Sequence, residues 1–253
     1  MPRPLARFAN IMSFGLIVTV VAVVSGAIAS VAGFGIGSLL TPTLAVETGT
    51  KVAVAAIALP HFVSTLLRFW LLRRHVDGRV LLGFGITSAI GGLVGAIIHV
   101  WLSSRALTIV FGALLILAAI AEFTGWMTKV RWGRRAAWIA GGLSGAFGGL
   151  VGDQGSIRSA AMLGFNVRKE SFVATAAAIG LFVDGARLPV YLVAQGRDIV
   201  NIWPLLAVLT LGVVIGTLLG TRLLGGIPQR VFRRSIAVLL VALGVYMIVV
   251  RGT

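Results

Sequence analysis

Cysteine is absent from the 253-residue chain, and acidic residues are scarce, with 7 Asp and Glu against 22 Lys and Arg. The absence of cysteine excludes disulfide bonds, thiol catalysis and thiolate metal sites. Charged residues form 11% of the chain, against roughly 25% in soluble domains, whereas hydrophobic residues reach 58%. This composition predicts an all-α protein that crosses a lipid bilayer several times.

Motifs typical of enzymes are also missing. The sequence contains no G-x-S-x-G, H-E-x-x-H, S-x-x-K or P-loop pattern, and its histidines, His61, His75 and His99, lack the spacing of metal ligands. We therefore expect no enzymatic activity, no metal site and no cofactor. We interpret His61 as a packed helix residue.

The net charge of +15 comes from basic residues that lie mostly at the ends of apolar runs. Basic residues in such positions anchor helices at the membrane surface and influence their orientation. We therefore expect contact with the lipid bilayer and no nucleic-acid partner. The apolar runs themselves are 11–24, 52–72, 80–102, 106–123, 136–152, 171–194, 202–224 and 231–250.

Glycine is abundant, with 33 residues, and it concentrates in two similar apolar stretches, 25–42 and 144–161. Each glycine inside a helix costs about 1 kcal/mol relative to alanine, and glycine readily adopts positive φ. We therefore predict an interrupted helix in each stretch. A half-helix or re-entrant arm is expected to follow each interruption, over 38–46 and over 157–165.

The two stretches belong to a longer internal similarity. Ser25-Gly26-Ala27 recurs 119 residues later as Ser144-Gly145-Ala146. The similarity also pairs Arg68 with Arg187, and Gly91 and Gly95 with Gly212 and Gly216. Such a nearly constant separation predicts two tandem repeats of about four spans each. Their expected bounds are 1–123 and 136–253, joined by a basic linker, 124–135; inverted and parallel arrangements both remain open.

Paired broken helices at matching positions of two halves are typical of a transporter's substrate site near the bilayer midplane. Broken backbone inside a membrane is tolerated only where protein or a watery cavity covers it. The free N–H groups and the positive end of each half-helix favour an anion. The expected binding residues of the two stretches are Gly33, Gly35, Gly37, Ser38, Gly152, Gln154, Gly155 and Ser156. We expect valine at Gly37 or Gly155 to abolish transport in a protein that still folds.

Three arginines in apolar surroundings complete the expected site. The planar guanidinium group matches the oxygens of an oxyanion, and an arginine within the membrane usually faces a partner or an aqueous cavity. We predict substrate binding by Arg158, Arg68 and Arg187. The alternative for Arg68 is that its side chain reaches the membrane surface, and the alternative for Arg187 is an internal pair with Asp184, three residues earlier.

Two acids are candidates to carry a coupling proton. Asp153 lies inside the second glycine stretch, and Asp184 lies within an apolar run. Acids within the membrane commonly take part in proton relays. For Asp153 an ion pair with Arg158, which would hold the loop, is an equal alternative.

The glycine stretches resemble those of the sulfite exporter TauE/SafE family, also called the toluene sulfonate uptake permease family. The sequence GFGIGSLLTP, residues 33–42, is similar to the first family signature, roughly G-x-G-x-G-x-L-x-x-P. The sequence GDQGSIRS, residues 152–159, looks like a variant of the second signature. The resemblance covers nearly the whole chain and implies a multi-pass transporter of sulfur-containing anions in the bacterial inner membrane.

The residues and the resemblance together favour a membrane transporter of sulfite, a sulfonate or a sulfoacetate-like anion. A secondary carrier, with a proton as the candidate coupling ion, is the main hypothesis. A passive anion channel and a membrane assembly partner without transport activity are the alternatives. The substrate, the direction of transport and the oligomeric state stay open at this point.

Overall fold

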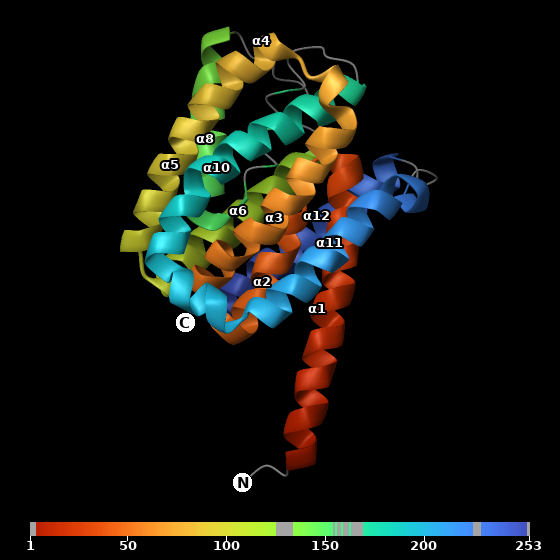
Figure 1. Cartoon of the computed structure of the whole chain (residues 1–253), viewed down its shortest axis with the longest axis vertical. Helices are drawn as coiled ribbons and strands as arrows, with labels where there is room; N and C mark the ends of the chain where they lie inside the picture. The colour runs from red at the N-terminus through yellow and green to blue at the C-terminus, as the bar shows by residue number, and fades with distance from the viewer. Residues whose placement is uncertain are drawn as a thin grey trace.

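The computed structural model describes residues 4–124, 134–153, 155, 158, 162, 169–224 and 229–251. This part of the chain is helical and contains no strand (Figure 1). The main helices are α1 (Pro4–Ala32), α2 (Ile36–Thr48), α3 (Thr50–Leu72), α5 (Ile86–Trp101), α6 (Ser104–Thr124), α8 (Arg134–Val151), α10 (Lys169–Asn201), α11 (Trp203–Leu224) and α12 (Gln229–Tyr246). Four short segments complete them, η1 (Arg73–His75), α4 (Gly78–Val80), η2 (Leu81–Gly85) and η3 (Met247–Arg251).

Within the described ranges, 6 helices are long and apolar enough to cross a membrane. They cover Phe14–Ala32, Thr50–His75, Gly78–Trp101, Ser104–Ala121, Ser171–Asn201 and Trp203–Gly220, and shorter apolar helices lie at Trp138–Val151 and Arg234–Val250. Large apolar side chains such as Val193 and Trp101, 90% and 83% exposed, point outward. An apolar exterior is stable in lipid, and the protein is therefore a multi-pass membrane protein.

Two helix pairs pack most extensively, α1 with α11 and α5 with α8. Glycine makes both contacts close, because the α-carbon of Gly26 lies directly against the carbonyl of Val213, and that of Gly145 against the carbonyl of Ser88. Small residues let helix backbones approach in this way in membranes. Each pair joins a helix from the first part of the chain to one from the second part.

These glycine contacts correct part of the sequence alignment. Gly91 lies against the carbonyl of Gly142, and Gly216 lies against the carbonyl of Val23. Because 23 and 142 are separated by the same 119 residues as the first matched triplets, the contacts make Gly216 the counterpart of Gly91. Within the predicted repeats, these contacts favour Gly216 over Gly212 as the counterpart of Gly91, a shift of four residues, or about one helical turn.

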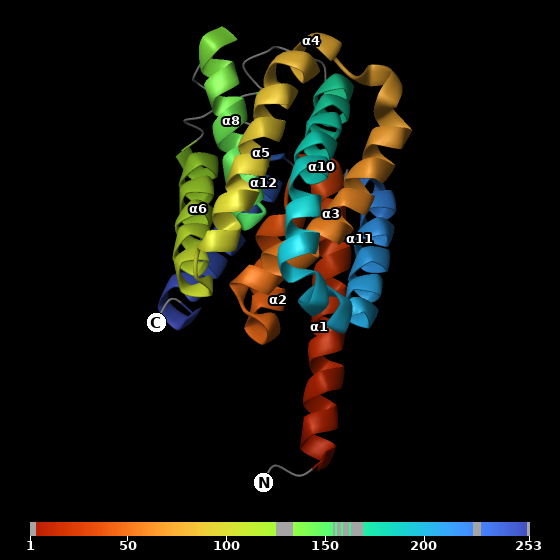
Figure 2. The same ribbon diagram turned by 60° about the vertical axis from the view of Figure 1, so that its left-hand side comes forward.

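Helices α1 and α8 run in opposite directions. In Figure 2, α1 rises from the N-terminus at the lower end, whereas α8 begins at the upper end. Helices α3 and α10 are also antiparallel, since His61 lies beside Asp184 and Thr65 lies beside Gly180. The bond between His61 and Asp184 thus lies where α3 and α10 cross.

Candidate functional site

The first glycine stretch contains a clear interruption between two helices. Helix α1 ends at Ala32 and α2 begins at Ile36. Gly33 and Gly35 lie between the two helices and have φ values of 79° and 128°. Residues that carry a Cβ atom rarely adopt such values. In the second stretch α8 ends at Val151, and Gly152 has a φ of 80°.

The two glycine stretches are in direct contact. The α-carbon of Gly37 lies against the carbonyl oxygen of Gly152, and the α-carbon of Gly155 lies against the side chain of Phe34. These contacts leave no room for a Cβ atom at either glycine. The residues therefore hold the two stretches together, in addition to any role of their N–H groups.

This contact changes the expected outcome of substitution. Alanine at Gly37 should already destabilise the protein by about 1–3 kcal/mol, because its Cβ atom overlaps a backbone oxygen that cannot rotate away. The expectation that a valine variant folds normally is therefore wrong. Alanine at Gly185, which has no neighbour within 4 Å of the added Cβ, is the matched control. Thermal unfolding of both purified variants tests this; equal melting temperatures would contradict the contact.

Arg158 reaches from the second stretch to the first. Its side chain is buried, 2% exposed, and its Nη2 atom donates a hydrogen bond of 2.9 Å to the carbonyl oxygen of Gly33. Within the described residues its Nε and Nη1 atoms have no hydrogen-bond partner. A buried guanidinium group with two unused donors is costly unless an acceptor is supplied.

Arg68 caps the end of α1 from inside the molecule. Its Nη1 atom donates to the carbonyl oxygen of Ala29 over 2.8 Å, and Nη2 donates to Thr65 Oγ1 over 3.1 Å. Its side chain is buried and its Nε atom has no partner in the described part of the chain. The alternative that Arg68 reaches the membrane surface is therefore wrong.

Arg187 has partners for its whole guanidinium group. The Nε and Nη2 atoms contact Asp184 Oδ1 at 3.0 and 2.8 Å, and Nη1 donates to the carbonyl oxygen of Gly148 over 2.7 Å. The other carboxylate oxygen of Asp184 lies 2.7 Å from Nδ1 of His61. Tyr191 donates its hydroxyl proton to the carbonyl oxygen of Gly149. The internal pair with Asp184 thus describes the contacts of Arg187.

Asp153 is buried but forms no ion pair with a described residue. Its carboxyl group interacts with the backbone N–H of Gly155 and the hydroxyl group of Ser38, which belongs to the other stretch. The predicted pair with Arg158 is thus not formed. Gln154 and Ser156 lie outside the described residues, as does most of the half-helix expected over 157–165.

The sequence reasoning missed two polar residues of this cluster. His61 was interpreted as a packed residue, yet it bonds Asp184 across 123 positions of the chain. Thr65 was not considered, yet it accepts a hydrogen bond from Arg68. A signal for Thr65 exists in the sequence, because it precedes Arg68 by three residues, as Asp184 precedes Arg187.

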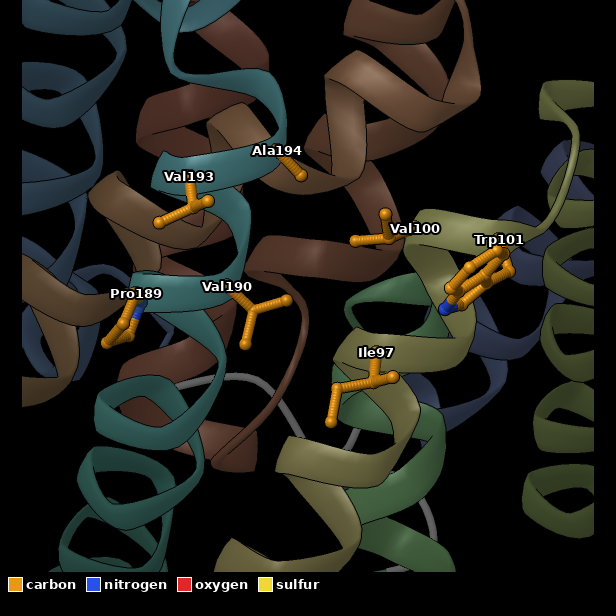
Figure 3. A pocket seen from close by; sticks show the side chains of 7 residues that line it. All are labelled: Ile97, Val100, Trp101, Pro189, Val190, Val193 and Ala194. Carbon is orange, nitrogen blue, oxygen red and sulfur yellow. The ribbon is translucent and has the colours of Figure 1, made fainter.

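An open groove between α5 and α10 lies apart from this polar cluster (Figure 3). Its volume is about 460 Å³, and it is lined by Ile97, Val100, Trp101, Pro189, Val190, Val193 and Ala194. No lining side chain carries a charge, so the groove does not suit a small anion. The buried arginines therefore provide the candidate anion site.

Comparison with known proteins agrees with this chemistry. A family model described as sulfite exporter TauE/SafE matches residues 18–247. Searches of curated proteins and of solved structures gave no match. Since the family match covers nearly the whole chain, the protein belongs to the TauE/SafE sulfite exporter family of membrane transporters.

Proposed function

We propose that the protein is a secondary carrier of small sulfur-containing oxyanions, such as sulfite, a sulfonate or sulfoacetate, in a bacterial inner membrane. The main support is Arg158, whose buried guanidinium group lies beside the contact of the glycine stretches and keeps two donor nitrogens without a described partner. Charge-assisted hydrogen bonds from such a fork suit sulfur oxyanions. A carrier fits better than a channel because the polar cluster is buried on all sides.

The anion site is proposed to combine the arginines with backbone groups of the glycine stretches. Helix α2 begins at Ile36 with 13 residues, so its first N–H groups form a positive end close to Gly35 and Gly37. Gly152 lies against Gly37, and Gly155 lies against the neighbouring Phe34. Ser38, Gln154 and Ser156 remain proposed contributors on the basis of their positions in the two stretches.

We further propose that the two halves are inverted repeats. Arg68 caps the carbonyl of Ala29 on α1, and Arg187 caps the carbonyl of Gly148 on α8. Arg187 lies 119 residues after Arg68, and Gly148 lies 119 residues after Ala29. The opposite directions of α1 and α8 support inversion (Figure 2). Inverted repeats place equivalent elements around one central site, as in many secondary transporters.

Asp153 is the proposed carrier of the coupling proton. Its carboxyl group interacts with both glycine stretches, so its charge would act on an anion bound at the proposed site. Asp184, the other candidate, is held between His61 and Arg187. A proton on Asp153 would remove a negative charge from the anion site, and the two ligands would then favour each other's binding.

Flux through the purified full-length protein in liposomes tests this function. We expect labelled sulfite or methanesulfonate to accumulate against its gradient when a proton gradient is imposed, and the accumulation to collapse with an uncoupler. Empty liposomes are the control. Flux that only follows the anion gradient would indicate a channel, and the absence of flux for every sulfur oxyanion tested would contradict the proposal.

A further inference from the structure

Two buried arginines have matching positions but different local partners. Arg187 holds the carboxylate of Asp184, three residues before it. Arg68 holds only the hydroxyl group of Thr65, three residues before it. Each arginine also donates its Nη1 atom to the end of a broken helix, at Gly148 and Ala29 respectively. The carboxylate that neutralises one arginine therefore has no counterpart beside the other.

The guanidinium group of a second arginine, Arg158, lies near Thr65. The position that a Cβ atom of Gly180 would take is 3.3 Å from Nη1 of Arg158 and 3.0 Å from the methyl carbon of Thr65. Arg158 therefore lies beside Gly180, which also adjoins Thr65, the residue that accepts a hydrogen bond from Arg68. Their three nitrogens without a described partner, Arg68 Nε and Arg158 Nε and Nη1, belong to this pair. Two buried guanidinium groups with unused donors require an acceptor between them.

The charges of the buried cluster indicate how much negative charge that acceptor carries. Besides the histidines and Tyr191, the ionisable side chains buried in the described part of the chain are Arg68, Arg158, Arg187, Asp153 and Asp184. With Asp153 ionised, that is, before it takes up the proposed coupling proton, three positive charges face two negative ones. One negative charge neutralises the cluster, whereas two would leave a net negative charge in a buried region, at a high cost in solvation free energy.

We propose that a single monovalent oxyanion, a sulfonate or hydrogen sulfite, binds between Arg68 and Arg158 in the way that the Asp184 carboxylate binds at Arg187. This inference rests on the proposed transport of sulfur oxyanions and assigns the charge and position of the bound anion. Arg187, whose donors are occupied, holds the structure and does not contact the anion. Thr65, unlike Asp184, brings no negative charge to the arginine three residues after it.

The substitution Thr65→Asp tests this assignment, because it places a tethered carboxylate where the anion is proposed to bind. The probes are methanesulfonate, a monoanion, and sulfate, a dianion, measured by calorimetry and thermal unfolding of the purified full chain. In the wild type, methanesulfonate should bind at least about tenfold more tightly than sulfate. Thr65→Asp should weaken methanesulfonate binding by roughly 100-fold and raise the melting temperature of the ligand-free protein. Thr65→Asn, of the same shape without the charge, should weaken binding far less.

Wild-type affinity for methanesulfonate in Thr65→Asp, or tighter binding of sulfate than of methanesulfonate by the wild type, would overturn the assignment. Should Thr65→Asp not fold, Arg68→Gln decides instead: roughly tenfold weaker binding supports the site, and unchanged binding overturns it. Wild-type protein that binds neither probe, and transports no sulfur oxyanion, would contradict the proposed function itself. The two failures are therefore distinguishable.

Discussion

Replacement of Arg187 by methionine is expected to lower the free energy of unfolding by about 3–5 kcal/mol. The guanidinium group binds Asp184 and the carbonyl oxygen of Gly148, and its side chain is 1% exposed. Removal leaves the carboxylate of Asp184 buried with His61 as its remaining partner. An uncompensated buried charge of this kind is among the most destabilising single changes.

Thermal unfolding of the purified variant in detergent gives the measurement, with an expected fall in melting temperature of the order of 10 °C. Arg222→Met is the matched control, because Arg222 is exposed and should tolerate the change. The double variant Arg187→Met with Asp184→Asn should recover part of the loss, since it removes the unpaired charge. A single Arg187→Met variant as stable as the wild type would contradict the structural role of this pair.

Replacement of Arg158 by glutamine is expected to weaken substrate binding roughly 10- to 100-fold, because charge-assisted hydrogen bonds in a dry site contribute about 1.5–3 kcal/mol. The unpartnered Nε and Nη1 atoms are the donors that the anion would use. Arg158→Lys should recover only part of the affinity, since an ammonium group keeps the charge and loses the planar fork.

Calorimetric titration of each purified variant with methanesulfonate gives this affinity, and membrane yield reports folding. Arg222→Gln serves as the control for removal of an exposed positive charge and should bind normally. Unchanged affinity in a well-folded Arg158→Gln variant would assign the residue to structure alone, as the link between the second glycine stretch and Gly33.

The helical membrane fold was predictable because it depends on composition and on the length of apolar runs. The interruption at Gly33 and Gly35 was predictable for a similar local reason, since glycine density weakens a helix wherever it occurs. The choice of the glycine on α11 that corresponds to Gly91 was less secure. Several glycines recur at four-residue spacing along α11, including Gly212, Gly216 and Gly220, so the sequence alone gives no reason to prefer one helical turn over the next.

The partners of the buried polar groups could not be predicted in the same way. The sequence identified Arg68, Arg158 and Arg187 as unusual. Each of them, however, donates a hydrogen bond to a carbonyl oxygen that lies 39 or 125 positions away in the chain. Such contacts depend on how helices cross in three dimensions. Spacing made accessible only partners one helical turn apart, Asp184 with Arg187 and Thr65 with Arg68.

The packing of α1 on α11 and of α5 on α8 determines which helices move together. At these contacts the backbones of the two helices touch at glycine. No side chain lies between them that could change rotamer and let one helix slide along the other. Each pair joins a helix from the first part of the chain to one from the second, so the two proposed repeats cannot swing apart as separate bodies without breaking both pairs. In the proposed carrier, the mobile units are therefore these mixed pairs, and a motion that opens the site to either side would shear α3 against α10, where His61 and Asp184 meet.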